Sequence, residues 1–212
     1  MMFDSTPNPD IYPSVVRVID DEESVRNSEA FTLRVAGIDA ITYESAEEFL
    51  DKDDLRRPGC IVLEVRMPGM SGLELQQEMQ KQGIDLPILF LTGHGDISIA
   101  VLTLKRGAED FCEKPVNPNR LRETARKMID RNIEERRRRL RVEGMLERWR
   151  TLTGREQEVA KLVASDMLNK QIAVHFSIQE HTGKIHRSNA RKKLEVRSAL
   201  ELNGFLKDIG LL

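Results

Sequence analysis

The stretch Cys60-Ile61-Val62-Leu63, followed at once by Glu64, decides the fold. Four consecutive apolar residues predict a strand that is buried on both faces, as the central strands of parallel sheets are. In such sheets ligands lie in the crevice at the carboxyl ends of the strands. An acid that ends a central strand therefore marks the place where a functional site is expected.

The sequence on either side repeats the same alternation of short apolar runs and amphipathic stretches. Further strands are predicted at Val15–Ile19, Ala40–Tyr43, Pro87–Leu91 and Asp110–Cys112. Helices are predicted at Glu23–Ala36, Ala46–Lys52, Leu73–Gln82 and Ile97–Arg106, with a fifth starting at Pro118. Five strand-helix units indicate the α/β class, with a (βα)5 doubly wound parallel sheet.

The remaining sequence predicts helices alone. From Leu121 to about Arg148 almost no helix breaker occurs, so one long, highly charged helix is expected, acting as a solvated linker in preference to a DNA contact. Four short helices are then expected, forming an all-α domain. Thr153 and Glu156 form a capping box for the first of these helices, and Asn169 is expected to cap the second. The third and fourth helices are expected at Glu180–Lys193 and Ser198–Lys207.

Charge is divided unevenly along the 212 residues. Residues 1–125 hold 13 Lys and Arg against 23 Asp and Glu, a balance of −10, and residues 126–212 hold 20 against 12, a balance of +8, which together give the net charge of −2. This asymmetry is typical of an acidic domain beside a nucleic-acid-binding domain. A solvated charged face explains the charges alone equally well.

Composition also bears on location. No apolar run is long enough to cross a bilayer, and Met1–Asp10 lacks a charged-then-apolar leader, so a cytoplasmic protein without a membrane partner is expected. Cys60 and Cys112 lie among apolar residues and are expected to be buried thiols rather than metal or redox groups.

Polar residues gather where the predicted strands end. Asp20 and Asp21 follow the first strand, Glu64 the third, Thr92 the fourth and Lys114 the fifth. Carboxylates are ligands for a hard divalent cation such as Mg²⁺, and a hydroxyl with an ammonium can meet phosphoryl oxygens. The predicted edge is therefore a site for Mg²⁺ and a phosphoryl group.

Four fragments in this order resemble the receiver domains of two-component response regulators, over residues 13–128: Val18-Ile19-Asp20-Asp21-Glu22, Met67-Pro68-Gly69-Met70-Ser71-Gly72, Leu91-Thr92-Gly93-His94-Gly95-Asp96 and Glu113-Lys114-Pro115. The resemblance implies that Asp20 and Asp21 bind Mg²⁺ together with Glu64 and the backbone carbonyl of Arg66. It also implies that Thr92 and Phe111 are switch residues and that Lys114 senses the phosphate.

The phosphoacceptor position departs from that family, because Glu64 stands where the family carries an aspartate. The extra methylene moves the carboxylate outward by roughly one C–C bond, which misaligns it for in-line attack. The same reach brings its oxygens toward Thr92 and Lys114. A phosphate-independent or phosphate-mimicking receiver is the preferred reading, with slow phosphorylation and an inert substitution as alternatives.

The C-terminal part resembles the DNA-binding domain of LuxR/FixJ/NarL-type regulators, through Leu152-Thr153-Gly154-Arg155-Glu156, Asn169-Lys170-Gln171-Ile172-Ala173 and Thr182-Gly183-Lys184-Ile185-His186-Arg187 with Lys193-Leu194. In that family the third helix enters the major groove. By position, the residues facing the bases are Lys184, Ile185 and Ser188. Candidates for phosphate contacts or helix orientation are Lys170, Thr182, His186, Arg187 and Arg191, with a structural role equally open for His186.

Three residues depart from this second pattern. Gln179 replaces a capping serine, Gly183 replaces an apolar residue, and Asp166 replaces a turn glycine and is expected near positive φ. The first two cost about 1 kcal/mol each in capping and helix propensity. The recognition helix is therefore expected to be marginal without DNA or a dimer partner.

The predicted organisation is a receiver at 13–128, a helical linker at 129–149 and a helix-turn-helix domain at 150–212. The predicted function is a transcription regulator of a two-component phosphorelay that binds double-stranded DNA, is paired with a sensor histidine kinase and dimerises when active. A protein-binding adaptor with a decayed DNA-binding domain is the alternative. A phosphohydrolase is disfavoured, because such enzymes need a nucleophilic aspartate with a second acid two residues on, and the chain has Glu64-Val65-Arg66.

Overall fold

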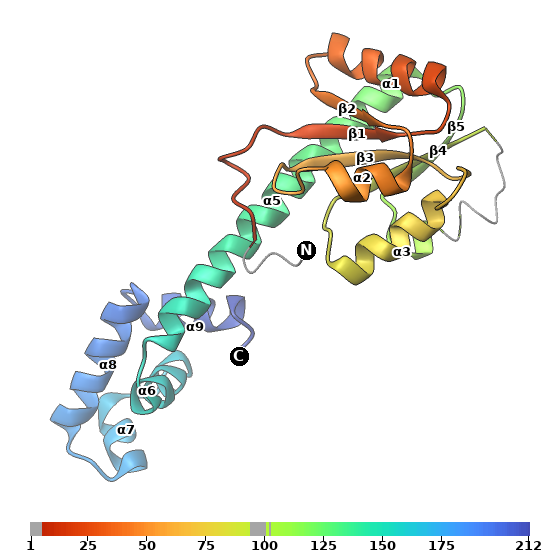
Figure 1. Ribbon diagram of the computed structural model, residues 1–212. Coiled ribbons are helices and arrows are strands. Elements are labelled where there is room, and N and C mark those ends of the chain that lie inside the picture. Colours follow the sequence, from red (N-terminus) through yellow and green to blue (C-terminus); the bar gives the residue numbers. More distant parts are fainter. Residues whose placement is uncertain (1–5, 94–100, 102) are drawn as a thin grey trace. The chain divides into compact units, whose positions relative to one another are not determined.

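A computed structural model describes residues 6–93, 101 and 103–212 (Figure 1). The chain forms two compact units, Met1–Arg137 and Arg138–Leu212. In the described part of the chain, no helix is both long enough and apolar enough to span a membrane.

The first unit is built on a five-stranded parallel sheet with the order β2-β1-β3-β4-β5. The strands are β1 (Val15–Ile19), β2 (Ala40–Tyr43), β3 (Gly59–Glu64), β4 (Ile88–Thr92) and β5 (Asp110–Glu113). The predicted doubly wound fold is confirmed, and the predicted strand ends are correct to within one residue. Because the order reverses beside β1 and β3, the crevice at their carboxyl ends is the expected ligand position.

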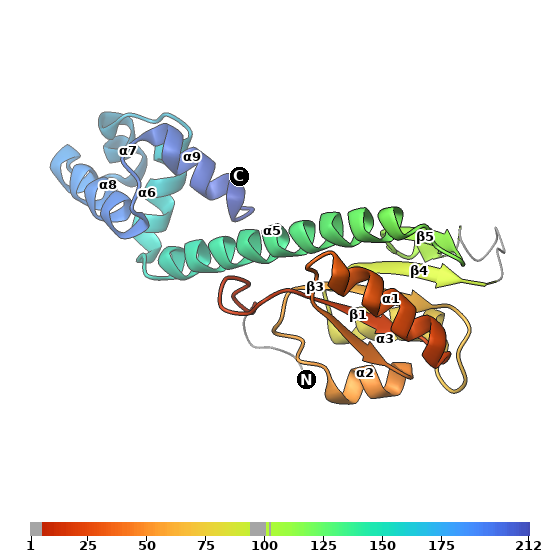
Figure 2. The same ribbon diagram turned by 90° about the horizontal axis from the view of Figure 1, so that it is seen from above.

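Helices cover both faces of this sheet: α1 (Glu23–Val35), α2 (Ala46–Lys52), α3 (Gly72–Gln82) and the first part of α5 (Pro118–Arg150). α1 and α5 cover one face, and α2 and α3 cover the other (Figures 1 and 2). Each face has its own apolar core, the first around Val62 and Leu121 and the second around Phe49 and Phe90. Of the helix expected at Ile97–Arg106, residues 97–100 and 102 lie outside the described residues.

A charged side chain is buried within the strand β1, contrary to the apolar reading of that segment. Arg17 has no exposed surface, and its guanidinium pairs with Asp53 at 3.0 Å. The same guanidinium donates to the carbonyls of Val15, Asp54 and Arg57. Arg17 therefore fastens the loop before β3 to the amino end of the sheet.

The second unit contains the four expected helices: α6 (Gly154–Ala164), α7 (Asn169–Phe176), α8 (Glu180–Leu194) and α9 (Ala199–Asp208). The capping box of Thr153 and Glu156 is confirmed. The expected cap at Asn169 is wrong: Leu168 is the N-cap, and its amide donates to the side chain of Gln171. The Asn169 side chain instead accepts from Arg187 at 3.1 Å.

The stretch expected as a solvated linker contributes to the cores of both units. Asn132 and Arg136 are buried in the first unit, at 3% and 1% exposure. Met145 and Trp149 are buried in the second, where they pack in the core that also holds Leu206. These buried positions were not predicted, because the charged residues between them dominate the sequence pattern.

Candidate functional site

The crevice at the carboxyl ends of β1 and β3 brings together Asp20, Glu64 and Lys114. The ammonium of Lys114, which follows β5, lies 2.5 Å from Glu64 Oε2 and also pairs with Asp20 Oδ2. Asp20 is 2% exposed and Glu64 is 7% exposed. The single ammonium thus pairs with two buried carboxylates at once, and it balances the charge of one of them.

The second oxygen of Glu64 is held by the backbone of its own loop. Glu64 Oε1 accepts from the amides of Val65 at 2.7 Å and Arg66 at 3.1 Å. The longer side chain therefore turns one oxygen back to the backbone while the other reaches Lys114. Both carboxylate oxygens of Glu64 are therefore engaged by groups of the protein.

The surroundings keep Lys114 charged. Burial lowers the pKa of Lys114, but hydrogen bonds to Asp20 and Glu64 outweigh that effect and leave its pKa above the ordinary value. Lys114 therefore keeps its positive charge throughout the neutral range.

A fourth ionisable group, which the sequence analysis missed, lies near this cluster. Glu29 of α1 is 7% exposed, and burial raises its pKa to about 8, although the charge of Lys114 lowers it. At neutral pH the protonated form of Glu29 is therefore favoured. A single acid within a polar helix gives no sequence signal of its own, so only the packing of α1 against the sheet identifies it.

The other predicted receiver residues occupy varied positions. Thr92 ends β4 and is 2% exposed. Phe111 in β5 is half-buried and packs against the core on the α2 and α3 face. Asp21 and Arg66 are exposed.

The donor set does not fit Mg²⁺ as it is arranged. Asp20 Oδ1 accepts from the amide of Glu22 at 2.9 Å, and its other oxygen pairs with Lys114. The oxygens of Glu64 are also taken, and no group of three or more His, Cys, Asp or Glu among the described residues is placed to hold a metal ion. Lys114 is therefore the cation that these carboxylates hold here.

The second unit presents a basic surface on α8. Lys184, Ile185 and Ser188, predicted to face bases, are exposed, and Ile185 is 44% exposed although it is apolar. Lys170 on α7 is also exposed. The other predicted phosphate or orienting residues are half-buried, and these are Thr182, His186, Arg187 and Arg191.

Part of this surface forms a groove of about 620 Å³. Its cationic lining consists of Lys184, Arg187, Arg191 and Arg197. Arg197 was not predicted from the sequence, where its only signal is its place just before Ser198, the cap of α9. Four cations along one concave surface suit a polyanionic backbone.

The three departures in this unit have visible structural counterparts. Gln179 is the N-cap of α8 and makes no side-chain capping bond. Gly183 is buried against α7, and Asp166 has a φ of 59°, as expected for a residue that replaces a turn glycine. Gln179 and Gly183 thus each leave a local cost of about 1 kcal/mol in place.

Two family profiles match the chain. The profile of the response regulator receiver domain covers residues 16–126. The profile of bacterial regulatory proteins of the luxR family covers residues 150–204.

The chain is similar along most of its length to several regulators. Nodulation protein W of Bradyrhizobium diazoefficiens is 36% identical, over 93% of this chain and 87% of that protein. The transcriptional regulatory protein FixJ of Azorhizobium caulinodans is 37% identical, over 88% of this chain and 89% of that protein. Among solved structures, the response regulator StyR has a TM-score of 0.83 at 38% identity, over 92% of this chain and 98% of StyR. Full-length FixJ from B. japonicum has a TM-score of 0.57 at 33% identity, over 95% of this chain and 99% of FixJ.

Proposed function

Because this chain belongs to the two-component response regulators that join a receiver domain to a LuxR-type DNA-binding domain, we propose that it regulates transcription without phosphoryl transfer to its receiver. The chain is a DNA-binding transcription regulator of that class, and its named relatives are regulators rather than enzymes. In the proposal residues 13–128 are the receiver, 129–149 the linker and 150–212 the DNA-binding domain.

The observation that carries the proposal is the double engagement of Glu64. One oxygen lies 2.5 Å from the Lys114 ammonium and the other accepts from two backbone amides. In-line attack on a phosphodonor needs a carboxylate oxygen aligned with the phosphorus atom. Here both oxygens are bound to groups of the protein. In the proposal, Glu64 supplies at all times the negative charge that a phosphoryl group would otherwise add at this position.

The first experiment tests phosphoryl transfer directly. The chain and its Glu64→Asp variant are incubated with acetyl phosphate and Mg²⁺, and intact masses are recorded. We expect an unchanged mass for the chain and the gain of one phosphoryl group by Glu64→Asp. A phosphoryl gain by the unaltered chain that is lost in Glu64→Ala would refute the proposal.

The second experiment tests whether Glu64 holds the chain in the state that binds DNA and dimerises. DNA binding and dimerisation are compared for the chain, for Glu64→Ala and for Glu64→Asp with and without acetyl phosphate. We expect the chain to match phosphorylated Glu64→Asp. Behaviour equal to that of Glu64→Ala would show that Glu64 is inert rather than a mimic.

The proposal also covers ligands and partners. We place double-stranded DNA against the exposed residues Lys184, Ile185 and Ser188, with phosphates near Lys170, Thr182, His186, Arg187 and Arg191. Pairing with a sensor histidine kinase, dimerisation on paired half-sites and a cytoplasmic location belong to the same proposal. Mg²⁺ would reach Asp20, Asp21, Glu64 and the Arg66 carbonyl only after the Lys114 ammonium had left its two carboxylates.

A further inference from the structure

A pocket of about 490 Å³ lies in the first unit between α1 and the segment that leads from β5 into α5. One wall is the stripe of α1 from Ser24 to Thr32, and the other runs from Lys114 to Leu121. Sites for small molecules typically measure about 300–1,000 Å³ and combine apolar surface with a few polar groups. This pocket, which we call the α1 pocket, therefore has the size of a small-molecule site.

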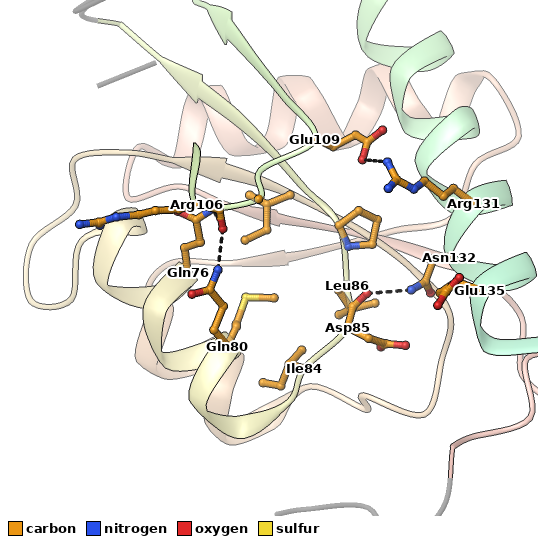
Figure 3. A pocket seen from close by; sticks show the side chains of 14 residues that line it. Gln76, Gln80, Ile84, Asp85, Leu86, Arg106, Glu109, Arg131, Asn132 and Glu135 are labelled. Carbon is orange, nitrogen blue, oxygen red and sulfur yellow. Dashed lines mark hydrogen bonds and ion pairs between the residues drawn. The ribbon is translucent and has the colours of Figure 1, made fainter. Parts of the chain in front are cut away.

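Another pocket of the same unit, at the amino end of β4, shows what balanced charge looks like in this protein (Figure 3). Figure 3 shows the ion pair of Glu109 with Arg131 on its wall. Asp85, which also lines it, pairs with the buried Arg136 at 2.6 Å. Each of these two carboxylates has a guanidinium of its own.

The α1 pocket has no such balance. Among the described residues that line it, Lys114 is the one cation, and its ammonium already pairs with Asp20 and Glu64. Two further acids, Glu22 and Glu29, line the same pocket. Acidic groups thus outnumber cations here, so the α1 pocket favours a cationic ligand over an anion.

Glu29 is the buried acid of this wall. It is 7% exposed, and burial and nearby charges act on its carboxyl, with no hydrogen bond among the described residues. The wholly buried side-chain atoms without a partner in the described part of the chain belong to other residues, Gln76 and Arg139. The carboxyl of Glu29 therefore keeps some accessible surface, on the pocket that it lines. A nearly buried carboxyl without a donor favours a ligand that donates to it.

The rest of the lining indicates the form of the ligand. Ser28 and Thr32 lie four residues apart on α1, so their hydroxyls follow one another along the wall that holds Glu29. On the opposite wall Val116 is half-buried and Pro118 is exposed, which provides apolar surface. We propose that the α1 pocket binds a small organic cation, a protonated primary amine on an apolar stem, whose ammonium donates to Glu29 and to these hydroxyls.

The test uses 2-phenylethylamine as the probe at pH 8.5, where the amine is protonated and Glu29, with a pKa of about 8, is mostly ionised. The matched controls are 2-phenylethanol, which is neutral and of equal length, and 3-phenylpropionate, which is an anion. Each is titrated into the full chain at physiological salt, while the methyl signals of Val25 and Val116, on opposite walls, are followed by ¹H–¹³C NMR.

We expect saturable shifts of both methyl signals with the amine. The alcohol should bind about tenfold or more weakly, which is the value of one hydrogen bond between charged groups. The anion should give no saturable shift. No saturable shift with the amine, or equal affinity for the amine and the alcohol, would overturn the proposal.

Three variants separate the proposed site from a general attraction of amines to an acidic domain. Glu29→Gln keeps the length of the side chain, removes its charge, and is expected to lose the preference for the amine. Glu23→Gln, an exposed change on α1 outside the pocket lining, should keep that preference. Thr32→Lys places an ammonium three residues from Glu29, where the two side chains can pair, and should abolish binding of the amine.

The methyl spectra also report whether each variant is folded. A preference for the amine that survives in Glu29→Gln, or binding that is unchanged in a folded Thr32→Lys, would contradict the assignment of Glu29 as the partner of the ammonium.

Discussion

The two units use charge in opposite ways. The first unit buries charged side chains: Arg17, Asp20, Glu29, Glu64 and Arg136 are each at most 7% exposed. The second unit buries Glu156, which pairs with Lys193, and lines its groove with cations that are exposed or half-buried. Charge therefore fixes internal geometry in the receiver, whereas in the DNA-binding unit it forms an outer surface.

Removing a buried charge from the first unit should have the largest effect on stability. Arg17→Met leaves the carboxylate of Asp53, which is 1% exposed, without its guanidinium partner. We expect a loss of about 3–5 kcal/mol in the free energy of unfolding, measured by urea denaturation. Arg56→Met, which removes an exposed pair with Asp54, is the control and should cost less than about 1 kcal/mol. Equal losses for the two variants would contradict the contrast.

A pH titration sharpens the contrast, because Glu29 is buried with a pKa of about 8 against an ordinary value of 4.5. A raised pKa in the folded state means that its contribution to stability is complete below about pH 4.5 and is lost as pH rises through about 8. Glu29→Gln should therefore be more stable than the parent at pH 8.5, by about 4 kcal/mol, with little difference at pH 4.5.

Thermal unfolding at the two pH values measures this difference. Glu23→Gln, an exposed change on the same helix, is the control. A pH-independent effect of Glu29→Gln would mean that Glu29 does not titrate in the folded state within this range.

Salt tests the outer surface of the second unit. Arg191→Ala removes a cation that lines the groove and should weaken DNA binding across sequences, lowering the slope of log affinity against log salt by about 1. Lys207→Ala, an exposed change on α9 away from the groove, should leave the slope unchanged. Binding that is insensitive to salt in the parent chain would remove the DNA-backbone contacts from the proposal.

The smallest expected effect is a gain in stability. The atom nearest to a Cβ added at Gly183 would be Ile172 Cγ2, at 3.7 Å. This distance is an ordinary van der Waals contact, so an alanine side chain fits. Gly183→Ala should raise the free energy of unfolding by about 1 kcal/mol through helix propensity. Denaturation followed by the fluorescence of Trp149, in the core of this unit, measures it. A loss of stability would show that the helix needs glycine at this position.

The strands and the central site could be predicted because their signals are local. Cys60–Leu63 is apolar without interruption, and parallel strands place Asp20, Glu64 and Lys114 at one edge whatever the details of packing. The bonds within that edge could not be predicted in full. That Glu64 Oε1 turns back to the amides of Val65 and Arg66 depends on the conformation of the loop.

The features that were missed depend on distant partners. Arg17 looks like an ordinary polar residue in a strand until loop carbonyls some forty positions away surround it. Asn169 looks like a cap until α8 brings Arg187 to its side chain. In both cases the decisive partner is remote in sequence, so no local pattern records it.

The helix α5 also has a consequence for how such regulators can be recombined. Its residues Leu121 and Met128 belong to one core, and Met145 and Trp149 belong to the other. A gene fusion made at residue 150, where the luxR-family profile begins, would deprive the incoming domain of two of its own core side chains. Exchange of output domains between relatives is therefore expected to succeed when the crossover falls in residues 137–144, where α5 has no buried side chain.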